Sequence, residues 1–452
     1  MRVHFIAIGG SAMHNLAIAL HLKGYAVSGS DDEIFEPSRS RLRQHGLLPE
    51  QEGWFPEKLT NQIDAVILGM HARADNPELL KAQEMGLRIF SYPEYLYNQS
   101  RNKKRVVIAG SHGKTTITSM ILHVLEDAGI ETDYMVGAQL EGFEVMVRLS
   151  ETAEWMVMEG DEYLTSPIDR IPKFLHYHPH IAVISGIGWD HVNVFPTFEN
   201  YLDQFRAFID SIEQGGTLIY CAEDIHVRKI SESFAGNKLP YYQHNCSTND
   251  NQVFIEHLGK HYPLQIFGNH NLTNLNAARE VCNLMGVNDA SFYQSISSFR
   301  GASLRLEKIA ANDGLVVYRD FAHAPSKLKA SVEALRKKYA DYQLVVCFEL
   351  HTFSSLSASF MQYYAGALDA ADLAVVFYDP HAVALKRLEK VSHDFIKEAF
   401  GRTDLLVVSE NKSLSVFLKQ MIQAPSVIAF MSSGSFGGIK LHDFAAEIIN
   451  KA

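Results

Sequence analysis

Residues 106–116 read Val106-Val107-Ile108-Ala109-Gly110-Ser111-His112-Gly113-Lys114-Thr115-Thr116, and this stretch decides how the chain is organised. The apolar run predicts a buried strand that ends at the first glycine, and the apolar spacing over residues 115–127 predicts an amphipathic helix. A strand, a turn ending in Gly-Lys-Thr and a helix form a site for a nucleoside triphosphate: backbone N–H groups and the lysine bind phosphates, and the threonine binds Mg²⁺. Ile108 stands where the general pattern has a glycine, so we expect a short variant of this loop.

The composition is that of an ordinary globular protein. At 452 residues and 47% apolar content, two or three domains with real cores are expected. The net charge of −11 argues against a nucleic-acid surface, and the four cysteines form no CxxC pair, which argues against a disulfide framework or a zinc site. There is no apolar run long enough to span a membrane and no signal-peptide pattern, so we expect a cytoplasmic protein.

The N-terminus has a Rossmann-type beginning. Strands are predicted over residues 3–8 and 25–29, with the turn Gly9-Gly10-Ser11-Ala12 and a helix over 13–22 between them. An acidic residue after the second strand, here Asp31, commonly bonds a ribose hydroxyl. The strict GxGxxG is absent, so two interpretations stay open, a nucleotide-diphosphate site and a tight strand-to-helix turn.

Two boundaries divide the chain. The polar run 98–105 lacks apolar periodicity and precedes the phosphate-loop strand, and a second boundary falls near residues 299–301. We therefore predict an α/β protein of three domains: a Rossmann-like domain over 1–103, a central P-loop domain over 104–299 and a Rossmann-like domain over 300–452. In the last domain, strands are predicted at 315–319, 344–349, 373–378, 405–408 and 427–432.

Polar residues follow several predicted strands of the central domain. A strand beginning at Trp155 ends in Glu159-Gly160-Asp161-Glu162, and carboxylates at a strand end beside a phosphate loop suit Mg²⁺, with Glu159 first off the strand. The alternative is an exposed acidic turn. The histidines of residues 176–180 are interrupted by a proline and have no carboxylate nearby in our interpretation, so we predict a loop there. The strand 181–184 leads through glycines to Trp189-Asp190-His191, again at a strand's carboxyl end.

A further helix is predicted to open at residues 267–278, where His270, Asn271 and Asn274 lie. Amide side chains there suit an adenine edge and equally suit helix capping, and both interpretations stay open.

In this order, the motifs resemble those of the Mur ligases, the ATP-dependent amide-forming enzymes of peptidoglycan synthesis. The resemblance rests on His4 to Met13, Ser28 to Asp31, Gly110 to Thr116, Glu159 to Glu162, Asp190-His191, His270 to Asn274, Arg305-Leu306-Glu307 and Asp320-Phe321-Ala322-His323.

The resemblance implies a role for each matching residue. Catalysis falls to Lys114, Glu159, His191 and Arg305. Thr115 holds one Mg²⁺, and Glu159 and His191 support a second. ATP is bound by Gly110, Ser111, His112, Gly113, Lys114, Thr115, Thr116, His270, Asn271, Asn274, Arg305 and Asp320. The UDP-sugar substrate is contacted by Gly9, Gly10, Ser11, Ala12, Met13, Asp31, His71 and His323.

Within the family, the segment from residue 161 to residue 191 resembles the branch that rejoins a recycled murein tripeptide, L-Ala-γ-D-Glu-meso-diaminopimelate, to UDP-N-acetylmuramate through an acyl phosphate. Three alternatives stay open: a family member that adds free L-alanine, a Mur-like binding protein without catalysis, and a nicotinamide-dependent oxidoreductase, which leaves the phosphate loop unexplained. A bacterial cytoplasmic protein is implied, a monomer or weak homodimer that binds neither nucleic acid nor membrane.

This sequence also departs from the family pattern at Gly186, Gly188, Ala324 and Ser355. In some Mur ligases a carbamylated lysine binds the second Mg²⁺. Since this chain has no lysine between His191 and Lys229, we predict no carbamylated lysine here.

Overall fold

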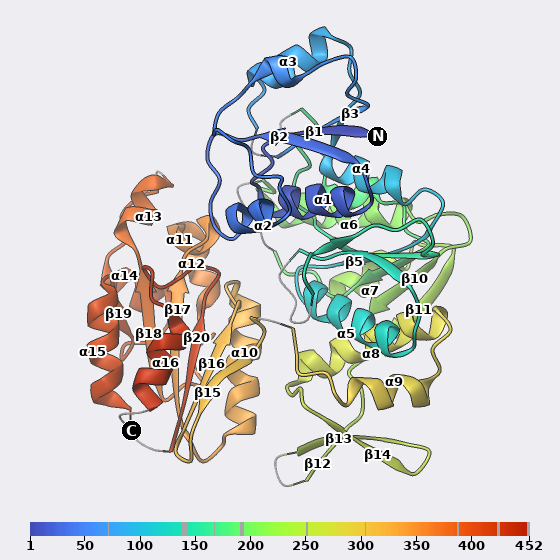
Figure 1. Ribbon diagram of the computed structural model, residues 1–452. Helices are drawn as coiled ribbons and strands as arrows, with labels where there is room; N and C mark the ends of the chain where they lie inside the picture. The colour runs from blue at the N-terminus through green and yellow to red at the C-terminus, as the bar shows by residue number, and fades with distance from the viewer. Residues whose placement is uncertain are drawn as a thin grey trace. The chain divides into compact units, whose positions relative to one another are not determined.

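The computed structural model describes residues 1–70, 72–137, 143–166, 168–189, 194–249, 252–302, 304–386, 388–422 and 425–449 (Figure 1). Among them the strands form four sheets, and the α/β class predicted from the sequence is confirmed. The chain clusters into two compact units, Met1–Ile187, Phe198–Tyr242 and Asn276–Phe292 in the first, Gly188–Thr197, Gln243–Leu275 and Tyr293–Ala452 in the second. None of the described helices is both long and apolar enough to cross a membrane.

The first sheet is parallel, in the order β2-β1-β3-β4. Its strands are β1 (Arg2–Ile6), β2 (Ala26–Ser30), β3 (Ala65–Leu68) and β4 (Ile89–Ser91). Its helices are α1 (Ser11–Leu22), α2 (Ser38–Gln44), η1 (Pro56–Lys58), α3 (Pro77–Glu84) and α4 (Tyr92–Gln99). Strand β1 ends two residues earlier than predicted, because Ala7 has a positive φ of 69° and turns the chain out of the sheet.

The central sheet has the order β11-β10-β9-β5-β8-β6-β7. Its strands are β5 (Lys104–Ala109), β6 (Thr132–Met135), β7 (Val147–Arg148), β8 (Trp155–Gly160), β9 (Ile181–Ile184), β10 (Thr217–Cys221) and β11 (Asn237–Tyr241). Strand β5 is parallel to both neighbours, β8 and β9, so the carboxyl ends of these three strands meet at one edge. The associated helices are α5 (Lys114–Asp127), η2 (Lys173–His176), α6 (Phe198–Asp210) and α7 (Ile225–Ser231).

Arg105 fastens the start of β5 to the segment before it. Its side chain is 2% exposed and donates to the carbonyls of Tyr177, Ser100 and Lys103 at 2.8, 3.0 and 3.2 Å, and to the Glu213 carboxylate at 2.9 Å. A guanidinium carries five donors in a rigid fork, so one side chain satisfies carbonyls from several loops. The polar run that the sequence marks as a boundary is therefore held by one buried cation.

A small antiparallel sheet follows that the sequence analysis did not predict. Its strands are β12 (Ser247–Asn249), β13 (Gln252–His257) and β14 (Lys260–Leu264). Helices α8 (Asn269–Leu284) and α9 (Asp289–Ile296) come next. All three residues of β12 are exposed, so the sequence has no apolar alternation there from which a strand could be predicted.

The last sheet has the order β15-β16-β20-β17-β18-β19 and is parallel except for β15. Its strands are β15 (Glu307–Ala311), β16 (Leu315–Asp320), β17 (Gln343–Leu350), β18 (Leu373–Tyr378), β19 (Leu406–Val408) and β20 (Ser426–Met431). Helices α10 (Pro325–Lys338), α11 (Phe353–Leu356), α12 (Ala358–Met361), η3 (Gln362–Tyr364), α13 (Pro380–Leu385), α14 (His393–Phe400), α15 (Asn411–Met421) and α16 (Leu441–Ile449) accompany it.

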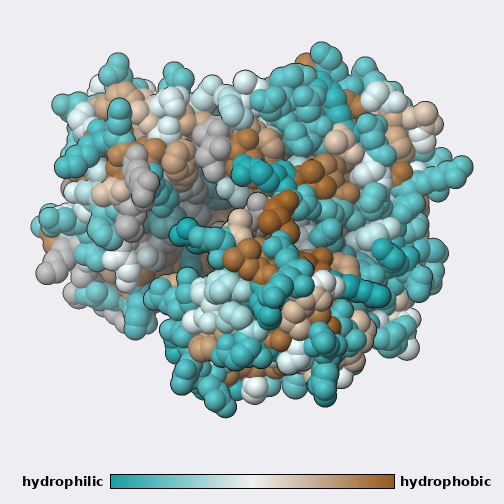
Figure 2. Space-filling model, turned by 90° about the horizontal axis from the view of Figure 1, so that it is seen from above, coloured by the Kyte–Doolittle hydropathy of each residue, from teal (hydrophilic) through white to brown (hydrophobic). Residues whose placement is uncertain are grey.

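Alternate residues of this sheet enter two separate cores. Val346 of β17 faces the core formed with α10 and α14, whereas Val345 and Cys347 face the core formed with α15 and α16. Both faces of the sheet are therefore buried, as is usual for parallel sheets. On the face of the molecule in Figure 2, hydrophilic residues predominate, with hydrophobic residues in smaller groups among them.

Candidate active site

The loop between β5 and α5 is packed tightly against the end of β9. Gly110 has a φ of +128°, and a Cβ there would lie 2.3 Å from Ser185 Oγ and 3.0 Å from the Gly186 carbonyl. The Ser111 N–H donates to that carbonyl at 2.9 Å. Only glycine fits such a position, and α5 then begins at Lys114, so that its first-turn N–H groups face the loop. This is the geometry of a phosphate cradle.

Lys114 lies across this loop in a partly buried ion pair, with its own side chain 19% exposed and that of Glu162 2% exposed. Its Nζ is 2.8 Å from Glu162 Oε2 and donates to the Gly110 carbonyl at 2.5 Å. Burial alone lowers the pKa of Lys114, but the charges of Glu162, Asp161 and Glu159 outweigh burial, and the pKa lies above its ordinary value. The lysine is therefore a fixed positive charge at the place where a polyphosphate would bind.

Two predicted metal ligands meet beside this lysine. The Thr115 hydroxyl donates to Glu159 Oε2 at 3.2 Å, and both residues are buried. Glu159 lies opposite Ile108 in the β5–β8 pairing, which brings its carboxylate to the loop. A carboxylate and a hydroxyl are the oxygen ligands that Mg²⁺ takes, so these residues fit the ion. His191, predicted to support the second Mg²⁺ with Glu159, lies outside the described residues, as does Asp190.

The histidines of residues 176–180 do have a carboxylate partner, and our expectation that none lies nearby was wrong. His176 Nε2 is 2.9 Å from Asp169 Oδ2, and Glu94 of α4 joins them, with ligand atoms all within 4.8 Å of one another. The isolated bridge between Leu164 and Pro172 folds the chain back and returns Asp169 to His176, a contact that sequence spacing does not reveal.

The first glycine turn encloses a carboxylate. The Gly9 N–H donates to Asp31 Oδ2 at 2.7 Å, and a Cβ on Gly9 would lie 2.9 Å from the same atom. Burial raises the pKa of the Asp31 carboxyl to about 6, although the Gly9 hydrogen bond opposes the shift. Ser11 and Ala12 begin α1 and are exposed, whereas Met13 is a core residue. The turn therefore places partly exposed backbone of Gly9 and Gly10 beside the Asp31 carboxyl group. His71, also predicted to contact this substrate, lies outside the described residues.

In the second unit, predicted ATP ligands gather at the carboxyl end of β16. Burial raises the pKa of Asp320, against the hydrogen bond from Ser331 and the charge of Arg305. The Arg305 guanidinium lies 4.8 Å from the Phe321 ring centre, and His323 Nδ1 lies 2.9 Å from the Phe321 carbonyl. A cation and a carboxyl group are thus held on one sheet edge.

The proposed adenine residues lie on the first turns of α8, which begins at Asn269. Asn271 Nδ2 donates to the Phe267 carbonyl at 2.9 Å, so the amide of this residue bonds to the backbone just before its own helix. Burial lowers the pKa of His270 to about 4, and the ring is therefore neutral near pH 7. Gly268 permits the approach of α10, because a Cβ there would lie 2.8 Å from Ala334 Cβ.

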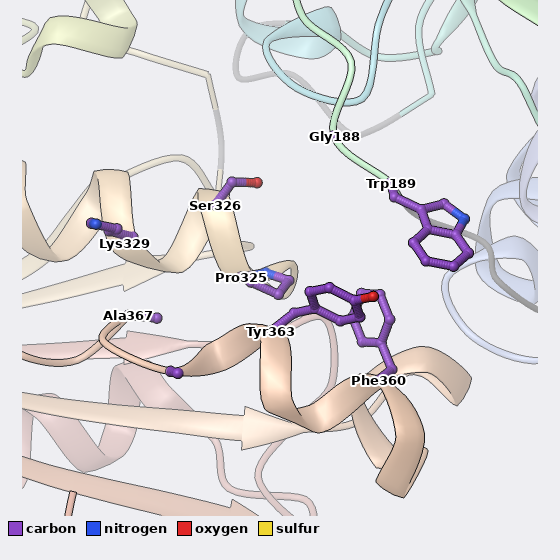
Figure 3. A pocket seen from close by; sticks show the side chains of 9 residues that line it. Gly188, Trp189, Pro325, Ser326, Lys329, Phe360, Tyr363 and Ala367 are labelled. Atoms are coloured by element: carbon purple, nitrogen blue, oxygen red, sulfur yellow. The ribbon is translucent and has the colours of Figure 1, made fainter. Parts of the chain in front are cut away.

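The second unit also contains a pocket of about 380 Å³, shown in Figure 3. Its aromatic side is made by Trp189, Phe360 and Tyr363: the Trp189 and Tyr363 ring centres lie 6.0 Å apart, and those of Phe360 and Tyr363 lie 5.1 Å apart. The start of α10 closes the other side with Pro325, Ser326 and Lys329. A mostly apolar pocket with three aromatic rings on one side suits an apolar group.

Two of the four residues that depart from the family pattern, Ser355 and Ala324, have a structural role in this fold. Ser355 is buried and its N–H donates to Thr352 Oγ1 at 3.0 Å, which caps α11. Ala324 is the N-cap residue of α10.

Sequence reasoning missed three residues that complete the phosphate loop. Ser185 packs against Gly110, Glu162 binds Lys114, and the Tyr201 hydroxyl donates to Glu162 Oε1 at 2.8 Å. Glu162 is the last residue of the carboxylate run Glu159-Gly160-Asp161-Glu162, so the sequence could have indicated it as a site residue. Tyr201 belongs to no motif, and its contact joins positions 39 residues apart.

Three family models match successive parts of this chain. They are described as "Mur ligase family, catalytic domain" over residues 2–104, "Mur ligase middle domain" over 108–282 and "Mur ligase, glutamate ligase domain" over 304–434. A curated UDP-N-acetylmuramate–L-alanine ligase of Caldicellulosiruptor saccharolyticus is 30% identical, over 95% of this chain and 95% of its own. The chain belongs to the Mur ligase family. It is an ATP-dependent, ADP-forming ligase that makes amide bonds, with the three-domain α/β architecture of the family.

Solved structures share the fold of this Mur ligase. UDP-N-acetylmuramate-alanine ligase of Thermotoga maritima is 21% identical with a TM-score of 0.72, and covers 100% of this chain and 99% of its own. A murein peptide ligase of Psychrobacter arcticus is 22% identical with a TM-score of 0.68, at the same coverage. The domain limits 1–103, 104–299 and 300–452 stay a prediction, as do the roles of individual site residues.

Proposed function

We propose that this Mur ligase joins the lactyl carboxylate of UDP-N-acetylmuramate to the amino group of an L-alanyl compound. The observation that carries the proposal is the meeting of Lys114, Thr115 and Glu159 at the joined carboxyl ends of β5 and β8. A carboxylate is a poor acyl donor at neutral pH, so transfer of the γ-phosphoryl group of ATP to it forms an acyl phosphate and ADP. The amine then attacks the acyl carbon, the amide bond forms, and inorganic phosphate leaves with one proton released.

The residues act mainly by position and charge. Lys114 neutralises the transferring phosphoryl group. Thr115 would hold one Mg²⁺ and Glu159 a second, and bound Mg²⁺ would supply further neutralisation of phosphate charge. Asp31 and the backbone of the Gly9 turn contact the UDP moiety. Arg305 and Asp320, in the second unit, contact ATP. The predicted bacterial cytoplasmic location follows from this chemistry and belongs to the proposal.

The names of the curated relatives support free L-alanine as the amine. The relative from Caldicellulosiruptor saccharolyticus and one from Carboxydothermus hydrogenoformans, the latter 28% identical over 97% of this chain, are both named as L-alanine ligases. They support this candidate better than they support a peptide.

The tripeptide L-Ala-γ-D-Glu-meso-diaminopimelate is the second candidate, and two observations favour it. The segment from residue 161 to residue 191 resembles the peptide-ligating branch, and the Lys173–Asp161 ion pair of 2.6 Å ties its first part to the end of β8. The pocket of about 380 Å³ beside Trp189 and Tyr363 exceeds what the methyl side chain of free alanine would fill.

Phosphate release tests both candidates. The enzyme is given ATP, Mg²⁺ and UDP-N-acetylmuramate with either free L-alanine or the tripeptide, and the UDP-linked product is identified by mass. Turnover with L-alanine alone supports the first candidate, and turnover with the tripeptide alone supports the second. Silence with both amines, or ligation that persists in Lys114→Ala, contradicts the proposal.

A further inference from the structure

A continuous chain of hydrogen bonds links the phosphate loop to its own lysine through helix α6. The Ser111 and Tyr201 hydroxyls lie 2.8 Å apart, the Tyr201 hydroxyl is 2.8 Å from Glu162 Oε1, and Lys114 Nζ is 2.8 Å from Glu162 Oε2. All four residues belong to the first compact unit. The two oxygens of one carboxylate are thus divided between a tyrosine and the lysine.

The direction of these bonds follows from the available protons. A tyrosine hydroxyl has one proton, and because an ionised carboxylate only accepts, Tyr201 donates to Glu162. The Ser111 hydroxyl must then donate to Tyr201. The ammonium of Lys114 has three N–H groups, and its bonds to Glu162 and to the Gly110 carbonyl use two of them. One N–H group is left for a phosphate oxygen without release of Glu162.

The tyrosine is fixed by packing. Its side chain is 0% exposed, and its ring meets Phe205 edge-on at 5.3 Å. Phe205 in turn packs against Phe174 at 5.6 Å, and Phe174 stacks on Phe208 at 4.7 Å. Because aromatic rings packed in this way leave little rotational freedom, the Tyr201 hydroxyl is held in one place.

We propose that Tyr201 is a positioning residue of the ligase reaction, which acts through Glu162 to hold the Lys114 ammonium at the phosphate loop. Ser111 connects the same hydroxyl to the loop, so that loop and lysine are set together. The inference rests on the phosphate loop of the proposed function. It adds Tyr201 and Glu162 as residues that position Lys114.

Tyr201→Phe removes one oxygen and leaves the ring packing in place. We expect kcat to fall on the order of tenfold, because the lysine is no longer held for the transition state. The KM for UDP-N-acetylmuramate should stay within about twofold, because the substitution removes no contact that binds this substrate. Tyr241→Phe is the matched control: Tyr241 is 1% exposed and ends the edge strand β11, which β10 and β9 separate from β5.

A double-variant cycle separates positioning from a merely structural role. If Tyr201 acts through Glu162, Tyr201→Phe in a Glu162→Gln background should cost less than about a further twofold in kcat, whereas independent roles would multiply. Unchanged kcat in Tyr201→Phe, or losses that multiply, would overturn the inference. If Tyr201→Phe does not fold, Glu162→Gln alone decides: an unchanged kcat overturns the inference. Activity retained by Lys114→Ala would instead refute the phosphate loop itself, and the two failures are distinguishable.

Discussion

The hydroxyl of Thr115 donates to the carboxylate of Glu159 at 3.2 Å, so that two residues, each predicted as a ligand of a different Mg²⁺ ion, are in contact with each other. One residue comes from the start of α5 and the other from the end of β8. Adjacent parallel strands place these ends together, and the helix start adds its hydroxyl. The pair is therefore formed by the fold itself.

Replacement of Glu159 by glutamine should raise the Mg²⁺ concentration needed for half-maximal activity on the order of tenfold, because a carboxylate ligand becomes a neutral amide. The measurement is a Mg²⁺ titration at saturating ATP. Glu154→Gln is the control, since Glu154 is an exposed residue paired with Lys104 just before the same strand. Equal Mg²⁺ requirements in both variants would remove Glu159 from the metal site.

Gly110→Ala should destabilise the protein and weaken ATP binding. The added Cβ would lie 2.3 Å from Ser185 Oγ in a backbone conformation with φ of +128°, and we expect a cost of about 1–3 kcal/mol from overpacking, beyond the backbone strain. Thermal melting and ATP titration check this. Gly129→Ala has positive φ and nothing within 4 Å of its Cβ, so it should show only strain, roughly 1–2 kcal/mol, and normal ATP affinity.

Asp31 should make stability depend on pH. Its carboxyl pKa is about 6 when folded, against an ordinary value of 3.8, so the folded state binds more protons between these values. Stability contributed at low pH is therefore lost as pH rises through about 6. Asp31→Asn keeps an acceptor for Gly9 and removes the titration, so its melting temperature relative to the parent should rise between pH 4 and pH 7. Asp313→Asn, the same substitution at an exposed position, is the control.

Arg105→Met should cost at least about 3 kcal/mol of unfolding free energy, because several buried carbonyls lose a shared donor. Urea unfolding measures this loss. Lys104→Met, one residue earlier and half-exposed, should change stability by less than about 1 kcal/mol. A loss for Arg105→Met no larger than that of its neighbour would contradict the structural role.

The elements with the clearest apolar runs were predicted best. Strands β9 (Ile181–Ile184) and β18 (Leu373–Tyr378) have the predicted limits, since polar residues flank short runs buried in the middle of a sheet. The loop before Lys114 was predicted from its own residues, because strand, turn and helix are local in sequence.

Contacts between distant segments could not be predicted in this way. Tyr201 meets Glu162 only because α6 packs beside the end of β8, and Asp169 meets His176 only because the chain folds back between them. Nothing in residue spacing indicates either contact. Two residues implied by resemblance, His71 and His191, lie outside the described part of the chain and stay predictions.

Arg105 also bears on how this sequence can diverge. One side chain donates to acceptors at six positions of the chain, so a neutral replacement would need compensating changes at several of them at once. Such a residue is difficult to lose by single mutations. Descendants of this protein should keep an arginine at position 105, while the exposed Lys104 beside it should be replaced freely.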